Sequence, residues 1–123
     1  MDILLVDDDR EVLAAIGTFL EDRGHRLATA PNATAALELM GLNLPDVILC
    51  DIQMPGMDGI AFLRACRSRF RQTPVVLMTA DRDLDMAIQA IRGGAADYLK
   101  KPVNVIELMS CLERSSAGGS SGR

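Results

Sequence analysis

The chain has 123 residues, of which 49% are hydrophobic and 24% charged, and its formal net charge at pH 7 is −4. This composition is that of one globular domain that is large enough to bury a core. No apolar stretch approaches the roughly 20 residues of a membrane span. The first residues also lack a signal-peptide pattern, so we expect a cytoplasmic protein without a membrane segment. The acidic balance argues against direct binding to nucleic acid, which requires a basic surface.

Short apolar runs alternate with helical patterns along the whole chain. The runs predict strands at residues 2–6, 25–29, 47–50, 75–78 and 97–100. The helical patterns lie at about residues 10–23, 31–43, 84–92 and 105–114, with a further helix following Asp58. Alternation of this kind, with right-handed crossovers, predicts an α/β fold. We expect a doubly wound, five-stranded parallel sheet of the flavodoxin-like order 2-1-3-4-5, with helices on both faces.

Helix ends and the chain terminus have their own sequence signals. Asp9 and Asp58 are suited to begin helices as N-caps, and Gly24 stands where a C-terminal cap glycine belongs. The last nine residues, SSAGGSSGR, are rich in glycine and serine and have no apolar anchor. We therefore expect one domain over residues 1–114 and a disordered linker or tail over residues 115–123.

Polar residues follow four of the predicted strands, at the point where each strand ends. Asp7 and Asp8 follow the first strand, Asp51 the third, Thr79 the fourth and Lys101 the fifth. Because parallel strands all end at one edge of a sheet, these side chains should gather there. Crowded carboxylates repel one another unless a cation lies among them, and hard oxygen ligands suit Mg²⁺. Asp51 is the candidate nucleophile, since a carboxylate can attack a phosphoryl group.

Each of these residues has a simpler interpretation when it is considered alone. An acidic run is more often a loop or a helix cap than a metal site, and Asp9 is the best cap of the three acids. Thr79 would be a β-branched strand residue, and Tyr98 a partly buried aromatic residue. Neighbouring residues on a strand point to opposite faces, so only one of Lys100 and Lys101 can face the site. The positions of the residues together, rather than their types, favour the functional interpretation.

Four motifs give the chain a specific family resemblance. They are ILLVDDD near the start, LCDIQMPGMDG in the middle, VVLMTA later and GAADYLKKP near the end. Together, in this order and each closing a strand, they resemble the receiver domain of bacterial two-component response regulators. The resemblance covers about residues 2–114.

The resemblance implies a role for each residue at the predicted edge. Asp51 is the phosphorylation site, and Mg²⁺, with Mn²⁺ as an alternative, is held by Asp7, Asp8, Asp51 and the backbone carbonyl of Gln53. Lys101 contacts the acceptor carboxylate and then the phosphoryl group, and the peptide bond to the following proline is cis in the family.

The resemblance further implies a conformational switch. Thr79 binds the phosphoryl group and moves toward it, while Tyr98 turns inward, so that the surface formed by residues 84–92, 97–100 and 105–114 is remodelled. Gln53 and Asp81 occupy two positions that vary in the family and tune its kinetics.

The implied partners follow from the same resemblance. They are a cognate histidine kinase or a histidine phosphotransfer domain as phosphoryl donor, and an output domain or partner protein that responds. No output-domain sequence is recognisable after Arg114. A homodimer through residues 84–92, 97–100 and 105–114 is a further hypothesis. On this interpretation the chain is a signalling domain with slow autophosphorylation and autodephosphorylation, and it is not a metabolic enzyme.

Three other functions remain to be weighed. A Mg²⁺-dependent phosphohydrolase would usually carry a second acid two residues after the nucleophile, where this chain has Gln53. A flavin-binding module of the same architecture would have to place an anionic flavin phosphate against acid-lined strand ends. A phosphate-independent receiver would not need the complete set of acids, threonine and lysine that is present here.

Overall fold

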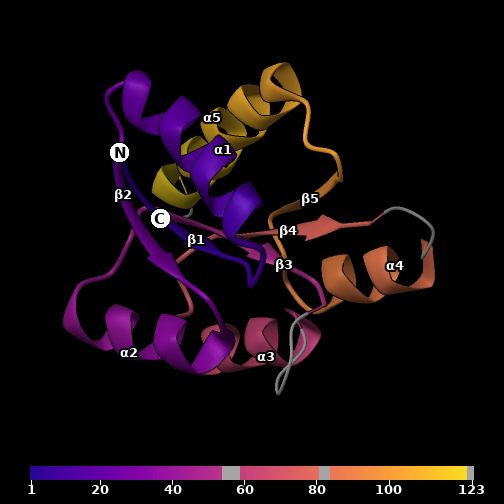
Figure 1. Cartoon of the computed structure of the whole chain (residues 1–123). Helices are drawn as coiled ribbons and strands as arrows, with labels where there is room; N and C mark the ends of the chain where they lie inside the picture. Colours follow the sequence, from indigo (N-terminus) through magenta and orange to yellow (C-terminus); the bar gives the residue numbers. More distant parts are fainter. Residues whose placement is uncertain (54–58, 81–83, 122–123) are drawn as a thin grey trace.

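A computed structural model of the chain describes residues 1–53, 59–80 and 84–121. Five strands and five helices alternate along it (Figure 1). In chain order they are β1 (Asp2–Val6), α1 (Arg10–Asp22), β2 (Arg26–Ala30), α2 (Ala33–Leu42), β3 (Val47–Asp51), α3 (Gly59–Arg69), β4 (Val75–Thr79), α4 (Leu84–Arg92), β5 (Asp97–Lys100) and α5 (Val105–Ser121).

The strands form one parallel sheet in the order β2-β1-β3-β4-β5, which confirms the predicted fold and strand order. Helices α1 and α5 lie on one face of the sheet, and α2, α3 and α4 lie on the other (Figure 1). As expected for a sheet covered on both faces, β3 and β4 are buried along their whole lengths.

Successive residues of the central strands supply two separate cores. Leu4 and Val6 of β1 pack with residues of α2, α3 and α4, whereas Ile3 and Leu5 pack with residues of α1 and α5. This division follows from the two-residue period of a strand, which turns neighbouring side chains to opposite faces.

The three cysteines are buried and unpaired, as is typical of structural thiols.

Most of the predicted helix ends agree with the structure. The Asp9 carboxylate accepts hydrogen bonds from the amides of Glu11 and Val12 and caps α1. Gly24 follows α1 with a φ of 88°, a conformation that glycine adopts readily. The predicted second strand lies one residue too early, since β2 covers Arg26–Ala30. The expected cap Asp58 lies outside the described residues.

The C-terminal helix differs from the prediction. We expected the helix to end at Arg114 and the following residues to be disordered, but α5 continues to Ser121. Ser115 is buried, so the packed face of α5 includes the first residue of the expected tail. Adding residues to an established helix requires no new nucleation, whereas each added glycine is less favourable than alanine by about 1 kcal/mol. In the described part of the chain, no helix has the length and apolar character needed to cross a membrane.

Candidate functional site

Strand pairing brings the predicted site residues to one edge of the sheet. Strands β1 and β3 are neighbours, and Val6 is paired with Cys50. Asp7 and Asp51 are the residues that directly follow this pair. On the other side of β3, Thr79 ends β4 and is paired with Lys100 of β5. The Lys101 amide donates a hydrogen bond of 2.6 Å to the Thr79 carbonyl, which holds the ends of β4 and β5 together.

Lys101 joins the two buried carboxylates of this edge. Its Nζ atom lies 2.8 Å from Asp7 Oδ2 and 3.3 Å from Asp51 Oδ2. Asp7 is 0% exposed and Asp51 is 9% exposed, so both depend on protein groups for much of their compensation. Lys100 is exposed, in agreement with the expectation that only one of the two lysines faces the site.

Backbone amides fix the other oxygen of each carboxylate. The Asp9 amide donates a hydrogen bond of 2.9 Å to Asp7 Oδ1, and the Gln53 amide donates one of 3.2 Å to Asp51 Oδ1. Since Asp9 also caps α1, the first turn of that helix is connected directly to Asp7. Both carboxylates are therefore oriented before any ligand arrives.

Burial and neighbouring charges shift the pKa values of Asp51 and Lys101. Burial raises the pKa of Asp51 above its ordinary value, and the Asp7 charge adds to this, although the Gln53 amide and Lys101 oppose it. Burial alone would lower the pKa of Lys101, but its hydrogen bond to Asp7 and the charges of both carboxylates raise it overall. The lysine is therefore firmly cationic at neutral pH.

Three carboxylates converge at the edge in a way that fits a metal ion. One carboxylate oxygen from each of Asp7, Asp8 and Asp51 lies within 4.8 Å of the others, and Asp8 is exposed to solvent. Hard carboxylate oxygens with open access to water are the ligand set that Mg²⁺ prefers, since it retains several waters. The donor set therefore fits the ion that the sequence predicts.

The remaining predicted residues lie around this group. Thr79 is buried at the end of β4, and Gln53 is exposed two residues after Asp51. Tyr98 is partly buried on β5 and packs against the core on the α2–α3–α4 face. The Lys101–Pro102 peptide bond is cis, as the resemblance implied. Asp81 lies outside the described residues.

Gly59 is a residue of the site region that the sequence analysis missed. A Cβ atom added to Gly59 would lie 2.5 Å from the Ile52 Cα and 2.9 Å from the Asp51 carbonyl oxygen. Its amide also donates a hydrogen bond of 2.6 Å to the Ile52 carbonyl. The start of α3 can therefore approach the end of β3 only without a side chain. We expected Asp58 only as a helix cap, although an Asp-Gly dipeptide also marks a backbone turn.

The fold and the edge cluster together define a class of protein. A family model for the response regulator receiver domain matches residues 3–113, and the chain therefore belongs to this family. This confirms the predicted family and favours a signalling domain over the phosphohydrolase and flavin alternatives.

Individual relatives agree with this assignment. The chain is 40% identical to the DNA-binding transcriptional regulator NtrC of Escherichia coli strain K12 over 113 residues, which are 92% of this chain and 24% of that protein. It is 42% identical to the regulatory protein AtoC of the same strain, again over 92% of this chain and 24% of the relative. The chain thus spans about a quarter of the length of the curated relatives it matches.

Solved structures show the same fold. A response regulator receiver domain protein from Clostridium thermocellum has a TM-score of 0.91 and 31% identity, covering 97% of this chain and 96% of that one. NtrX from Brucella abortus has a TM-score of 0.91 and 31% identity, covering 97% of this chain but 27% of that chain.

Proposed function

We propose that this domain is a phosphoryl-accepting switch, with Asp51 as the acceptor. The observation that carries the proposal is the contact of Lys101 Nζ with both Asp7 and Asp51, beside three converging carboxylates. An acceptor carboxylate needs nearby positive charge, because the incoming phosphoryl group is itself anionic. The donor would be a phosphohistidine of a histidine kinase or of a histidine phosphotransfer domain.

The chemical step is a displacement at phosphorus. An Asp51 oxygen attacks the phosphorus, a new P–O bond forms, and the P–N bond to the donor imidazole breaks. The imidazole leaves with the electron pair and takes up a proton. Hydrolysis returns Asp51 to its unphosphorylated form. Water attacks the phosphorus, the P–O bond to Asp51 breaks, and inorganic phosphate leaves while the carboxylate is restored. Both reactions are slow self-directed steps of a signalling domain rather than the turnover of an enzyme.

The chain's own residues position the reacting groups. Asp7, Asp8, Asp51 and the backbone carbonyl of Gln53 would hold Mg²⁺, or Mn²⁺ as an alternative. When bound, the ion supplies positive charge that neutralises the acceptor and the phosphoryl oxygens. Lys101 is close enough to Asp51 to contact a phosphoryl group attached there. The side chain of Gln53 and that of Asp81 would tune how readily water or a donor reaches the site.

The response would be carried by the surface of α4, β5 and α5. In the phosphorylated state, Thr79 would be drawn toward the phosphoryl group and Tyr98 turned inward, which changes this surface. Exposed apolar residues support a docking role for it, namely Ile88 and Ile91 of α4 and Val105 and Ile106 of α5. The surface would control an output domain or partner protein, and a homodimer could form through it. The setting would be the cytoplasm.

Intact mass after incubation with acetyl phosphate tests the proposal. The wild type should gain one phosphoryl group with Mg²⁺ and none after removal of divalent ions by a chelator. The Asp51→Asn variant should gain none under either condition, whereas Asp9→Asn, which replaces a neighbouring acid with another good N-cap, should behave like the wild type. Absence of a gain in the folded wild type would contradict the proposal and favour the phosphate-independent alternative. A gain that persists in Asp51→Asn would assign the acceptor elsewhere.

A further inference from the structure

Arginines are concentrated in one part of this acidic chain. Residues 59–80 contain four arginines and no Asp or Glu, although Asp and Glu outnumber Lys and Arg by 17 to 13 overall. The four belong to α3 and to the turn that follows it: Arg64, Arg67, Arg69 and Arg71. Residues 59–80 therefore carry a net positive charge within an acidic chain.

Two of these arginines have contacts within the chain that hold them in place. The Arg67 guanidinium donates hydrogen bonds to the carbonyls of Phe70 and Thr73. The Arg69 guanidinium lies 5.2 Å from the centre of the Phe70 ring. Both also stand in the last turn of α3, where positive charge is favourable at a helix C-terminus. Interactions within the chain and with the end of α3 therefore explain why arginines stand at positions 67 and 69.

The helix does not account for Arg64 and Arg71. Arg64 lies in the middle of α3 and Arg71 beyond its end, and both are exposed. Within residues 1–53, 59–80 and 84–121, the structure records no hydrogen bond or ion pair for either side chain. Their charges are therefore available to a partner.

A fifth arginine joins the group from α4. A Cβ atom added to Gly94, just after α4, would lie 2.9 Å from Arg67 Cδ, and one added to Gly93 would lie 3.2 Å from Leu63 Cδ2. The end of α4 therefore lies directly against the second half of α3. Arg92, in the last turn of α4, is exposed at this junction. We name the group the arginine face, and it consists of Arg64, Arg67, Arg69, Arg71 and Arg92.

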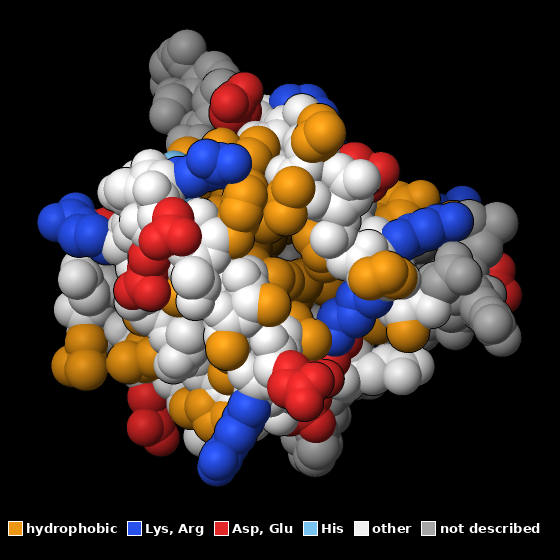
Figure 2. All heavy atoms as spheres, turned by 45° about the horizontal axis from the view of Figure 1, so that its top comes forward, with side chains coloured by type: hydrophobic (Ala, Val, Ile, Leu, Met, Phe, Trp, Pro, Cys, Tyr) orange, Lys and Arg blue, Asp and Glu red, His pale blue; other side chains and the backbone are white. Residues whose placement is uncertain are grey.

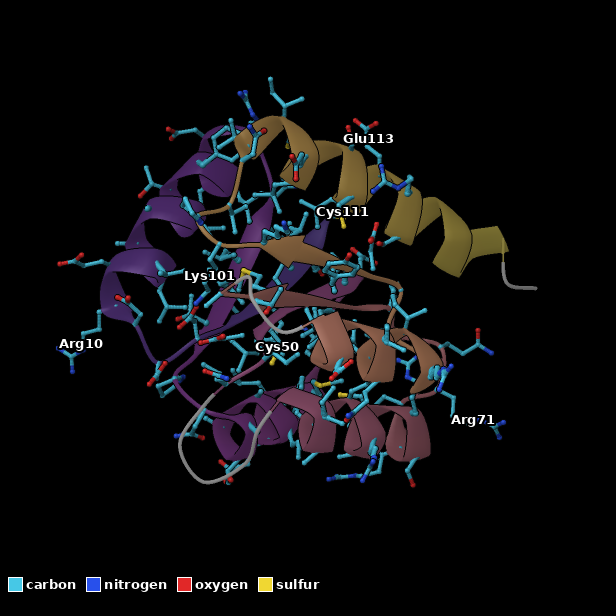
Figure 3. All side chains as sticks on the ribbon, turned by 90° about the vertical axis from the view of Figure 1, so that its right-hand side faces the viewer. Arg10, Cys50, Arg71, Lys101, Cys111 and Glu113 are labelled. Carbon is cyan, nitrogen blue, oxygen red and sulfur yellow. The ribbon has the colours of Figure 1, made fainter. Side chains whose placement is uncertain are left out.

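The arginine face is remote from the candidate phosphorylation site. Helix α3 begins beside the end of β3 and runs back toward the start of β4. Figure 3 shows Arg71 at the opposite end of the molecule from Lys101 and Arg10. The face formed by α1 and α5 is different in character, because acidic and basic side chains are interspersed there around a hydrophobic centre (Figure 2).

We propose that the arginine face docks an acidic segment of a partner protein. Guanidinium groups form paired hydrogen bonds with carboxylates, and the three contacts of Arg67 and Arg69 hold part of the face in place. A short acidic segment is long enough to contact five arginines. An extended nucleic acid would also approach the acidic side chains of the rest of the chain, which repel its phosphates. Because four of its five arginines lie on α3 or in the turn after it, outside the α4–β5–α5 surface that phosphorylation would change, docking does not require phosphorylation.

Titration with a defined acidic probe tests this inference. The probe is a fluorescent hexaglutamate peptide, measured by anisotropy at low salt and mapped by amide shifts of the full chain. We expect the shifts to cluster at residues 64–71 and 92. The Arg64→Glu/Arg71→Glu variant should bind about tenfold more weakly. The control Arg10→Glu/Arg23→Glu carries the same change of charge elsewhere and should bind within about twofold of the wild type, and circular dichroism verifies that both variants are folded.

Several outcomes would overturn the inference. Equal weakening in both double variants would mean that only the net charge matters. Shifts confined to other residues would move the site elsewhere. Tighter binding of a duplex oligonucleotide, or of phosphatidylserine vesicles, than of the peptide would assign the face to nucleic acid or membrane instead. The Asp51→Asn variant should bind the peptide like the wild type, so failure of docking and failure of the phosphorylation proposal are distinguishable.

Discussion

Lys101 Nζ donates a hydrogen bond of 2.8 Å to Asp7 Oδ2, although the two residues are 94 positions apart in the chain. The same nitrogen lies 3.3 Å from Asp51 Oδ2. One lysine is thus shared between a fully buried carboxylate and the proposed acceptor. Because its contact with Asp51 is longer than its contact with Asp7, Lys101 interacts more closely with Asp7 in the unphosphorylated chain. A phosphoryl group on Asp51 would compete with Asp7 for it.

Replacement of Lys101 should destabilise the fold. In Lys101→Met the buried Asp7 carboxyl loses its partner, which should lower the free energy of unfolding at pH 7 by about 1–3 kcal/mol. This is less than for a fully buried pair, because the lysine side chain is 22% exposed. Urea unfolding without divalent ions measures the effect. The neighbouring Lys100→Met, on an exposed side chain, should lower it by no more than about 1 kcal/mol. Equal effects of the two substitutions would mean that the contact with Asp7 contributes little.

Replacement of Gly59 should be costly because of its close approach to β3. In Gly59→Ala the new methyl group would meet the Ile52 backbone at 2.5 Å, and backbone cannot yield as a flexible side chain does. We expect a loss of about 1–3 kcal/mol in the free energy of unfolding, together with amide shifts at Asp51 and Ile52. The matched control is Gly41→Ala, within α2, where no heavy atom lies within 4 Å of the added Cβ. It should stabilise the protein by up to about 1 kcal/mol. A neutral Gly59→Ala would contradict the steric argument.

Mg²⁺ should stabilise the folded chain, and Asp8 should be required for much of the effect. A ligand that binds only the folded state adds about 2.7 kcal/mol at a concentration one hundred times its Kd. In Asp8→Asn the exposed carboxylate is lost without disturbing a buried contact, so stability without metal should remain near that of the wild type. The rise in melting temperature with added Mg²⁺ should shrink, and a chelator should abolish it in both proteins. An unchanged rise in Asp8→Asn would remove Asp8 from the proposed ligand set.

The contribution of Asp97 to stability should disappear in acid. Burial alone would raise the pKa of Asp97, but its hydrogen bonds with Arg114 and the Tyr98 amide, and the Arg114 charge, lower it overall. A carboxyl group with a lowered pKa in the folded state stabilises the fold at pH values above its ordinary pKa of 3.8, and this stabilisation is lost as the pH falls through the folded value. The Asp97→Asn variant should therefore unfold at lower urea concentration than the wild type at pH 7, with the two curves converging as the pH falls below 3.8 and through the folded pKa of Asp97. A difference that is the same at pH 7 and in acid would mean that the ionised form of Asp97 is not what stabilises the protein.

Much of the fold could be predicted because the relevant signals are local. The strand and helix periods, the cap at Asp9 and the glycine at position 24 are all encoded within a few neighbouring residues. The helix that continues to Ser121 was missed for the same reason: glycine and serine indicate a break locally, whereas the packed turns before them favour continuation.

Local sequence patterns were enough to predict the order of the elements and the edge of the sheet at which Asp7, Asp51, Thr79 and Lys101 would meet. Parallel strands share one edge, so residues that end such strands are brought together whatever their separation in the chain. The packing of the folded chain was needed to show how Lys101 divides its contacts between Asp7 and Asp51, and that Gly59 must lie against Ile52. It also decided that Arg92 joins the arginines of α3. These relationships depend on distances of a few ångströms between elements, which are set by the register of the strands and the packing of the helices rather than by neighbours in the sequence.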